Sequence, residues 1–392
     1  MKQGWEVKKL GDVCDLITCG VAARPQYVDE GIPFLSAKNV KEGKIIWSGY
    51  NCISEQTHNE LTKNNKPLLG DILYTRVGSY GEAAVIEDDY EFSVFVSLTL
   101  IKVSESTVSN YFLKHYLNSD YVKQLAKKSI SGSGVGNLNV GTVREFPIKF
   151  PSLPEQQRIV AILDEAFDAI AQAKANAEQN LKNAKELFES YLQSVFENKG
   201  EGWEDVRFED LCKLTRGHNP PKSKFSAEHK SGYVRFYQIR DGWSDDYVVY
   251  VPETPQLHKV EPDEILMVAY RHIGKVFRGV SGAFNVALCK ISNKDRNKLN
   301  DDFLFYIIPT DVVKGELMKR SERSLIPSMS VEHLKEIIIP LPPIQVQQSI
   351  VQKLDALSTE TKQLESIYQQ KINDLDELKK SILQKAFAGE LH

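Results

Sequence analysis

Two stretches of the chain place apolar or small residues at spacings that alternate mainly between three and four. These positions are 159, 163, 166, 170, 173, 177, 181, 184, 187, 191 and 195 in the first stretch, and 350, 354, 357, 364, 368, 372, 375, 378 and 382 in the second. Such a heptad seam is typical of helices that pair with one another. Prolines precede both stretches and Gly200 and Gly389 follow them, as at helix starts and C-caps. The pattern predicts two helices of about 42 residues, roughly 60 Å each.

The two seams can pair in two ways. Antiparallel pairing within the chain would hold one globular domain at each end of a rod and relate the domains by a pseudo-twofold axis. A homodimeric coiled coil between two chains is the alternative, and the pattern alone leaves it open.

The sequence also repeats itself. Gly4-Trp5-Glu6 recurs as Gly202-Trp203-Glu204, and Gly70-Asp71-Ile72-Leu73 matches Asp263-Glu264-Ile265-Leu266. In the helical stretches the offset is a constant 191 residues, with 14 identities among the 42 positions from 155 to 196. The segments outside the helices are much less similar. The chain therefore reads as domain, helix, second domain, second helix, with like helices and unlike domains.

Short apolar runs bounded by turn residues indicate strands within the domains, for example at 71–75, 95–103, 264–268 and 337–339. We expect an α+β fold: two mixed α/β domains separated by two long helices that form an intramolecular antiparallel coiled coil. The expected boundaries are 1–150 and 199–340 for the domains, and 151–198 and 341–392 for the helical spacers.

Composition narrows the class of protein. The 392 residues are 42% hydrophobic and 26% charged, an ordinary globular balance. Five scattered cysteines without a CxxC pair argue against a disulfide scaffold and a zinc site. No apolar stretch approaches the roughly 20 residues of a membrane span, and the N-terminus does not read as a signal peptide. A cytoplasmic protein without membrane contact is the expectation.

No motif requires an active site or a metal. Asn219-Pro220-Pro221-Lys222 resembles the Asn-Pro-Pro-aromatic motif of amino-methyltransferases, but Lys222 cannot stack on a flipped base. The Ser131–Gly136 run fits neither glycine-rich phosphate motif, and it reads as a flexible loop. The histidines and serines show no metal-ligand or nucleophile-elbow spacing. We expect no catalytic residues, no metal and no cofactor held by this chain.

Polar loops instead recur at matching places in the two halves. Arg, Lys, Asn, Gln, Ser and Tyr side chains donate to phosphates and read base edges, although any one loop can equally be an ordinary solvated loop. Arg76 and Arg271 are the strongest candidates for a guanine contact. The candidate DNA-binding residues are Arg24, Lys38, Asn39, Arg76, Ser79, Tyr80, Ser131, Ser133, Asn137, Arg216, His218, Lys222, Lys224, Tyr237, Gln238, Arg240, Tyr270, Arg271, His272, Lys275, Arg323 and Ser324.

The arrangement resembles the specificity subunit of type I restriction–modification systems, over essentially the whole chain. Pro-Leu-Pro-like segments precede Gln-Gln-x-Ile-Val-x-x-Leu-Asp at 151–164 and 342–355, and the chain ends in Lys385-Ala386-Phe387-Ala388-Gly389-Glu390-Leu391. The first copy has Pro154-Glu155-Gln156, as the family pattern does. The second copy departs from it with Ile344-Gln345-Val346, which puts the corresponding partner contact in doubt.

The resemblance implies a non-catalytic subunit that determines which DNA sequence a methyltransferase and nuclease complex recognises. Each domain would read one half of a bipartite site in double-stranded DNA, and the helices would fix the spacer. Two modification subunits, which carry the S-adenosylmethionine site, would dock on the chain, and motor-endonuclease subunits would join them. The candidate docking residues are Gln156, Gln157, Gln347, Gln348, Phe196 and Phe387.

Two other classes remain to be tested. A coiled-coil adaptor would bind protein without reading DNA, and a stand-alone methyltransferase would need the cofactor loop that the sequence lacks. A half-length specificity protein that dimerises is excluded, since both copies lie in one chain.

The net charge of −4 argues weakly against a nucleic-acid partner. The negative charge lies on the helical stretches, which hold 10 basic and 15 acidic residues. Residues 211–240 instead hold seven Lys/Arg and one acidic residue. This local basic segment favours phosphate contact, with tight DNA binding left to the complex.

Overall fold

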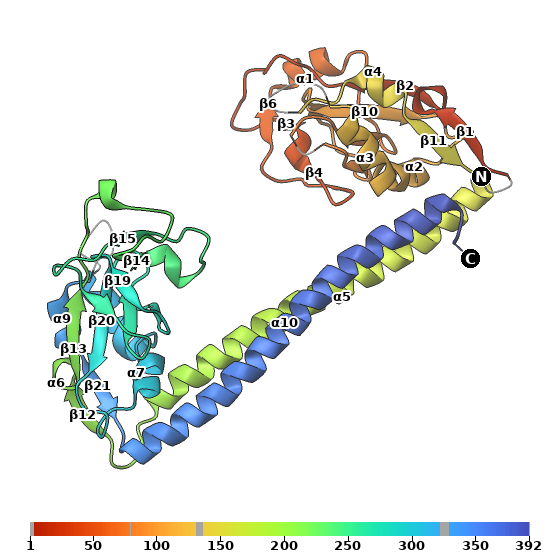
Figure 1. Cartoon of the computed structure of the whole chain (residues 1–392). Helices are drawn as coiled ribbons and strands as arrows, with labels where there is room; N and C mark the ends of the chain where they lie inside the picture. The colour runs from red at the N-terminus through yellow and green to blue at the C-terminus, as the bar shows by residue number, and fades with distance from the viewer. Residues whose placement is uncertain (1–3, 79, 131–135, 322–328, 392) are drawn as a thin grey trace. The chain divides into compact units, whose positions relative to one another are not determined.

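A computed structural model describes residues 4–78, 80–130, 136–321 and 329–391. The chain divides into two compact units, one formed by Met1–Glu178 with Gln369–His392 and the other by Gln179–Tyr368. The two long helices, α5 (Leu153–Glu197) and α10 (Ile344–Ala388), each contribute to both units (Figure 1). Each unit therefore contains one globular domain and about half of each long helix.

The first domain is built on a four-stranded antiparallel sheet in the order β2-β10-β7-β8. These strands are β2 (Cys14–Cys19), β10 (Leu98–Val103), β7 (Ile72–Thr75) and β8 (Ala83–Val85). All four residues of β7 are buried, as expected for a strand that is covered on both faces. Ile72 and Tyr74 belong to the core that contains the domain helices, whereas Leu73 belongs to a second core on the opposite face.

Three smaller sheets complete this domain. β1 (Glu6–Lys9) pairs with β11 (Pro147–Phe150), and β4 (Val40–Lys41) pairs with β5 (Lys44–Ile45). The third sheet has the order β6-β3-β9, from β6 (Asn51–Ile53), β3 (Ile32–Leu35) and β9 (Ser93–Val94). The helices are α1 (Glu55–Thr62), α2 (Asn110–Leu117), α3 (Asp120–Lys128) and α4 (Val140–Arg144), with short 3-10 turns η1 (Leu10–Asp12) and η2 (Ala37–Asn39).

The second domain repeats this frame. Its main sheet has the order β13-β20-β17-β18, from β13 (Cys212–Arg216), β20 (Leu288–Asn293), β17 (Ile265–Val268) and β18 (Val276–Phe277). β17 is again fully buried, with Ile265 and Met267 in one core and Leu266 and Val268 in another. β12 (Glu204–Arg207) pairs with β21 (Ile338–Leu341) as β1 pairs with β11.

The second sheet of this domain gains one strand. Its order is β15-β14-β19-β16, from β15 (Tyr250–Pro252), β14 (Tyr233–Tyr237), β19 (Gly282–Phe284) and β16 (Lys259–Val260). The helical segments are α6 (Phe208–Leu211), η3 (Lys222–Lys224), η4 (Ile239–Gly242), α7 (Asp301–Ile307), a π-helical turn η5 (Asp311–Gly315), α8 (Glu316–Ser321) and α9 (Val331–Lys335). The duplication predicted from the sequence is therefore present in the strand order of the main sheet.

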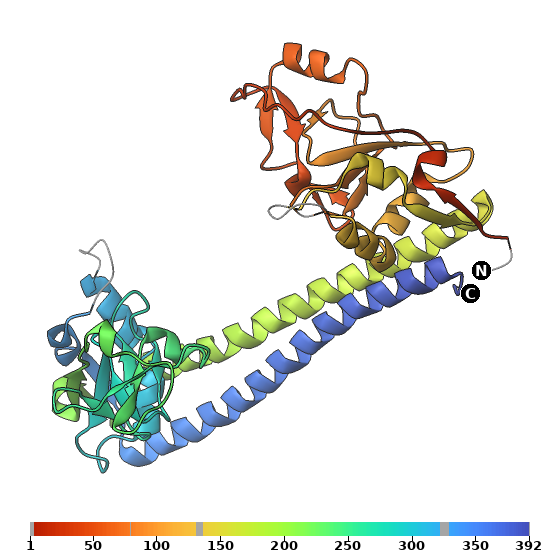
Figure 2. The same cartoon turned by 45° about the horizontal axis from the view of Figure 1, so that its top comes forward.

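Within each unit the two long helices lie side by side and run antiparallel (Figures 1 and 2). In the first unit, Nη2 of Arg158 donates to the carbonyl oxygen of Leu391 at 3.0 Å, and Nζ of Lys174 lies 2.7 Å from Oδ1 of Asp376. In the second unit, the core contains Leu192 and Phe196 of α5 with Val351 and Leu354 of α10. The predicted α+β fold with intramolecular antiparallel helices is confirmed.

Two glycines at equivalent strand ends show how closely the frame is repeated. Gly20 follows β2 and Gly217 follows β13. A Cβ at Gly20 would lie 2.0 Å from the carbonyl oxygen of Val94, and one at Gly217 would lie 2.1 Å from that of Asn285. Only glycine fits where the backbone passes this close to a neighbouring strand end.

Candidate nucleic-acid interface

Two loops that the sequence singled out meet around one exposed tryptophan in the second unit. Trp243 follows η4, and its ring lies 5.6 Å from the His272 ring in an edge-to-face arrangement. Nζ of Lys275 lies 3.9 Å from the centre of the same indole, a cation–π contact. Trp243 stays 48% exposed despite these neighbours. An exposed indole flanked by two cationic or titratable side chains is suited to contact a base beside a phosphate.

The η4 turn sets the direction of these side chains. Its buried Asp241 accepts the backbone N–H of Gln238 at 2.7 Å through Oδ2, which closes the turn from the inside. Burial raises the pKa of the Asp241 carboxyl, and the nearby Arg235 opposes that shift. Because Asp241 points inward, its neighbours Arg240 and Trp243 are exposed.

Two more cation–aromatic pairs lie in the same loops, and both cations are exposed. The Arg240 guanidinium lies 5.2 Å from the Tyr247 ring centre, and Tyr247 is 65% exposed. The Arg271 guanidinium lies 5.6 Å from the Tyr270 ring centre. Arg271 has a φ of 64°, which is uncommon for a residue with a side chain. We call Arg240, Trp243, Tyr247, Tyr270, Arg271, His272 and Lys275 the aromatic–cationic cluster.

The equivalent region of the first domain is different, and it corrects two expectations. Arg76 is 6% exposed, and its guanidinium donates to the carbonyl oxygens of Leu138 at 2.8 Å and Val96 at 3.0 Å and to Oδ1 of Asn137 at 3.0 Å. Its donors are used inside the domain, so it is not offered to guanine. Asn39 is 1% exposed, and its amide donates to the carbonyls of Ile46 and Ser48.

Arg216 in the second domain also has a structural role. Its Nη2 donates to the carbonyl oxygen of Met329 at 2.7 Å, and the residue is only half-buried. Tyr237, another candidate for DNA contact, is 4% exposed and lies in a core at the buried end of β14. These two side chains are therefore poor candidates for reading a base.

The other candidates differ in exposure. Arg24, Lys38, Asn137, His218, Lys222 and Lys224 are exposed, whereas Tyr80 and Gln238 are half-buried. Ser79, Ser131, Ser133, Arg323 and Ser324 lie outside the described residues. Sequence reasoning missed Trp243 and Tyr247. The available signal was an aromatic residue on each side of the polar run Ser244-Asp245-Asp246, where no core position is expected.

The docking candidates divide into two groups. Gln157 and Gln348 are exposed. Gln156 and Gln347 are fully buried, and Phe196 is 2% exposed, so these three side chains bind within the chain instead of facing a partner. Phe387 is half-buried and packs on Phe112 and Tyr116 of α2, with ring centres 5.4 Å and 5.1 Å apart.

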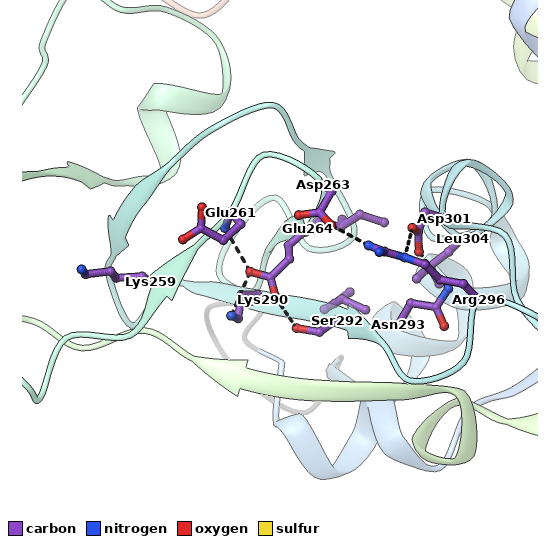
Figure 3. Close-up of a pocket in the computed structure, with 12 residues that line it drawn as sticks. Lys259, Glu261, Asp263, Glu264, Lys290, Ser292, Asn293, Arg296, Asp301 and Leu304 are labelled. Atoms are coloured by element: carbon purple, nitrogen blue, oxygen red, sulfur yellow. Dashed lines mark hydrogen bonds and ion pairs between the residues drawn. The ribbon is translucent and has the colours of Figure 1, made fainter.

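A cavity of about 400 Å³ lies beside β17 and β20 in the second domain (Figure 3). Glu264 accepts from Lys290 at 2.9 Å and from Ser292 at 2.7 Å, while Arg296 binds Asp263 and Asp301. Four acidic and three basic residues line it, and these ion pairs consume most of their charge. This cavity is therefore unsuited to a phosphate backbone.

The rest of the described chain offers little reactive chemistry. Burial raises the thiol pKa of Cys14 and Cys212 to about 12 and that of Cys289 to about 11, so these thiols are protonated at neutral pH. Among the described residues, no group of three or more His, Cys, Asp or Glu side chains could hold a metal ion. No helix in the described ranges is long and apolar enough to cross a membrane.

Comparison with known proteins identifies the family of this chain. The model of the type I restriction modification DNA specificity domain matches residues 2–183 and 200–374. A putative type I restriction enzyme specificity subunit of Methanocaldococcus jannaschii, MjaX, is 24% identical over 420 residues, which cover 99% of this chain and 94% of that protein. The EcoKI specificity subunit of Escherichia coli K12 is 21% identical, over 100% of this chain and 90% of that protein.

The fold has a solved counterpart. A chain from a structure described as the basis of complex assembly and conformational transition of the type I R-M system has a TM-score of 0.83 with this one, at 21% identity. The superposition covers 100% of this chain and 99% of the other. The chain therefore belongs to the type I restriction–modification DNA specificity family.

Proposed function

We propose that each globular domain reads one half of a bipartite site in double-stranded DNA, and that the paired helices fix the spacer and dock two modification subunits. The chain itself is non-catalytic in this proposal. The modification subunits hold S-adenosylmethionine and transfer the methyl group, and motor-endonuclease subunits join to form the cleaving complex.

The contrast between frame and loops is the main support. Both domains have the same four-stranded sheet order, yet the loops after β17 and β14 carry the aromatic–cationic cluster, whereas the described residues of the equivalent loops in the first domain form no such cluster. Two readers on one frame with different exposed side chains are suited to two different half-sites. In the second domain, the cluster is the surface that we assign to base and phosphate contact.

The main test is to express the chain with its modification subunit and to map methylated adenines by single-molecule sequencing. A bipartite motif with a constant spacer is the expected result. Replacing residues 200–340 with the second domain of another family member should change one half-site and leave the other. Methylation with no defined motif, or a change in both half-sites, would contradict the proposal.

The spacer function can be tested on the helices. Removing residues 171–177 from α5 and 373–379 from α10 deletes one heptad from each helix, around the Lys174–Asp376 ion pair. Seven helical residues span about 10 Å, which corresponds to roughly three base pairs. We expect a shorter spacer with both half-sites unchanged. Deleting the heptad from α5 alone is the control, because it breaks the helix register and should abolish methylation.

A coiled-coil adaptor that binds only protein is the competing function. It predicts that the modification subunits associate with the chain but that no DNA fragment is protected from nuclease digestion. Footprinting of the assembled complex on the mapped motif decides between the two functions.

A further inference from the structure

One glutamine at the start of α5 ties that helix to the first domain. Gln156 is fully buried, and its Oε1 accepts the backbone N–H of Ser109, the residue before α2, at 2.8 Å. Its Nε2 donates to the carbonyl oxygens of Thr107 at 3.1 Å and Pro151 at 2.8 Å. One side chain thus joins three backbone segments: the loop before α2, the end of β11 and the first turn of α5.

The second domain repeats this junction bond for bond. Oε1 of the fully buried Gln347 accepts the backbone N–H of Asn300, the residue before α7, at 2.8 Å. Its Nε2 donates to the carbonyl oxygens of Lys298 and Pro342, both at 2.8 Å. The same three bonds therefore recur at equivalent places, although the two domains differ widely in sequence.

Further along the same long helices, a carboxylate makes a second contact with each domain. Oδ1 of Asp164 lies 2.8 Å from Nε2 of His115 on α2. Oδ1 of Asp355 accepts from the hydroxyl of Tyr306 on α7 at 2.6 Å. Asp164 and Asp355 each lie eight residues, about two helical turns, after the glutamine.

The other long helix contacts the same domain helices. Phe387 of α10 packs on Phe112 of α2, and Phe196 of α5 packs on Phe303 of α7 at a ring distance of 5.3 Å. Each of α2 and α7 is thus held by one long helix through polar bonds and by the other through an aromatic ring.

We infer that Gln156 and Gln347 are positioning residues that hold each domain at a fixed orientation on the long helices and so make the spacer selective for one length. This inference rests on the proposed function. The apolar contacts alone would keep each domain attached, but apolar contact is non-directional. Three hydrogen bonds with fixed geometry define an orientation, and a small rotation of a domain would move its reading loops along the DNA.

The variants are Gln156→Leu and Gln347→Leu, which keep most of the side-chain volume and remove the amide. Gln172→Leu and Gln363→Leu are the matched controls, because these glutamines are exposed at equivalent positions of the same two helices. All four proteins are assembled with the modification subunit before measurement. Thermal melting by circular dichroism confirms that each variant is folded.

The first readout is local and does not depend on DNA. Hydrogen–deuterium exchange should accelerate in peptides that contain Ser109 in Gln156→Leu and in peptides that contain Asn300 in Gln347→Leu. Each variant should leave the other domain unchanged, and the controls should match the wild type. Unchanged exchange in the folded variants would overturn the junction itself.

The second readout is methylation of duplexes whose spacer is one base pair shorter, correct or one base pair longer. Each junction variant should raise methylation at the incorrect lengths by about tenfold relative to the correct one, as for an orientation preference of roughly one hydrogen bond. The bases required in both half-sites should stay the same. Faster exchange with unaltered spacer selectivity would overturn the positioning role. Absence of a bipartite motif in the wild type would instead overturn the proposed function.

Discussion

In both domains an arginine side chain donates to the backbone carbonyl oxygen just before the last short helix, but the two arginines come from different parts of the sheet. Leu138 and Met329 each precede the last short helix of their domain, and each donates its backbone N–H to the end of the buried central strand, at Arg76 and Ala269. In the first domain Arg76, at the end of β7, binds the carbonyl of Leu138. In the second, Arg216 of β13 binds that of Met329.

This difference changes what the loop after the central strand can do. In the first domain that strand ends in an arginine whose donors are used inside the fold. In the second, the arginine is supplied by β13, and the loop from Tyr270 to Lys275 exposes Arg271, His272 and Lys275 to solvent. The loop after the central strand therefore begins with a structural arginine in one domain and carries exposed cations in the other.

The largest expected effect concerns the two arginines that bind backbone carbonyls inside the domains. Arg76→Leu leaves the carbonyls of Leu138 and Val96 without their donor, so we expect the first unit to lose about 3 kcal/mol of unfolding free energy. Arg216→Leu should cost about 1 kcal/mol, because Arg216 is half-buried and makes one such bond. Urea titration with each variant checks the order. Equal losses would show that the two arginines are equivalent.

The next largest effect concerns the exposed aromatic–cationic cluster of the second domain. Trp243→Ala should remove a base contact worth about 1–3 kcal/mol and relax the second half-site, with the first half-site unchanged. Competition binding of the assembled complex to duplexes with single base changes measures this. Tyr90→Ala is the control, because Tyr90 is also exposed but lies in the first domain. A loss in both half-sites would indicate general destabilisation.

Arg271 sharpens the distinction between base and phosphate contact. Arg271→Gly keeps the positive φ without strain and removes the whole side chain, including the guanidinium. If Arg271 reads guanine, we expect one base position to relax by about 1–3 kcal/mol. Uniform weakening across all sequences, with a shallower salt dependence, would mark it as a phosphate contact instead.

The smallest effect is a difference in pH dependence between the two junctions. Burial lowers the pKa of His115, Lys114 and Lys379 add to this shift, and Asp164 opposes it. The hydrogen bond from His115 lowers the pKa of Asp164. Since both pKa values are depressed by folding, the first unit should lose stability as the pH falls below about 6.5. Burial raises the pKa of Tyr306, so this hydroxyl stays protonated over the same pH range. Unfolding of wild type and His115→Phe at pH 7 and pH 5 tests this, and the variant should be less sensitive to acid.

Much of the frame follows from the sequence. The heptad seams predict the two helices because burial repeats with the helix period, but they leave open whether the helices pair within one chain or between two. The duplicated strands are visible because buried central strands, such as 72–75 and 265–268, read as apolar runs. The repeated Gln-Gln pair was visible, but it predicted partner docking and not the buried junction that Gln156 and Gln347 form.

The roles of individual polar residues cannot be predicted from the sequence in the same way. Gln156 bonds Ser109, which lies 47 residues away in sequence, and Arg76 bonds Leu138, which lies 62 residues away. Whether a polar side chain is buried is set by such distant partners, so Arg76 and Gln156 look like surface residues in the sequence. Trp243 was overlooked for the converse reason, because aromatic residues are usually assigned to a core.

The glutamine junction has a consequence for how this chain can diverge. All three bonds of Gln156 and all three of Gln347 go to backbone groups: one N–H, which every residue except proline supplies, and two carbonyl oxygens, which every residue supplies. The helix therefore does not depend on the side chains of the domain at these bonds. A different domain would need the same loop path before its α2 or α7 counterpart to keep these bonds, and its own side chains would have to meet Asp164 or Asp355 and the aromatic ring of the other long helix. If each domain reads one half-site as proposed, a change of half-site requires no compensating change at the glutamine bonds.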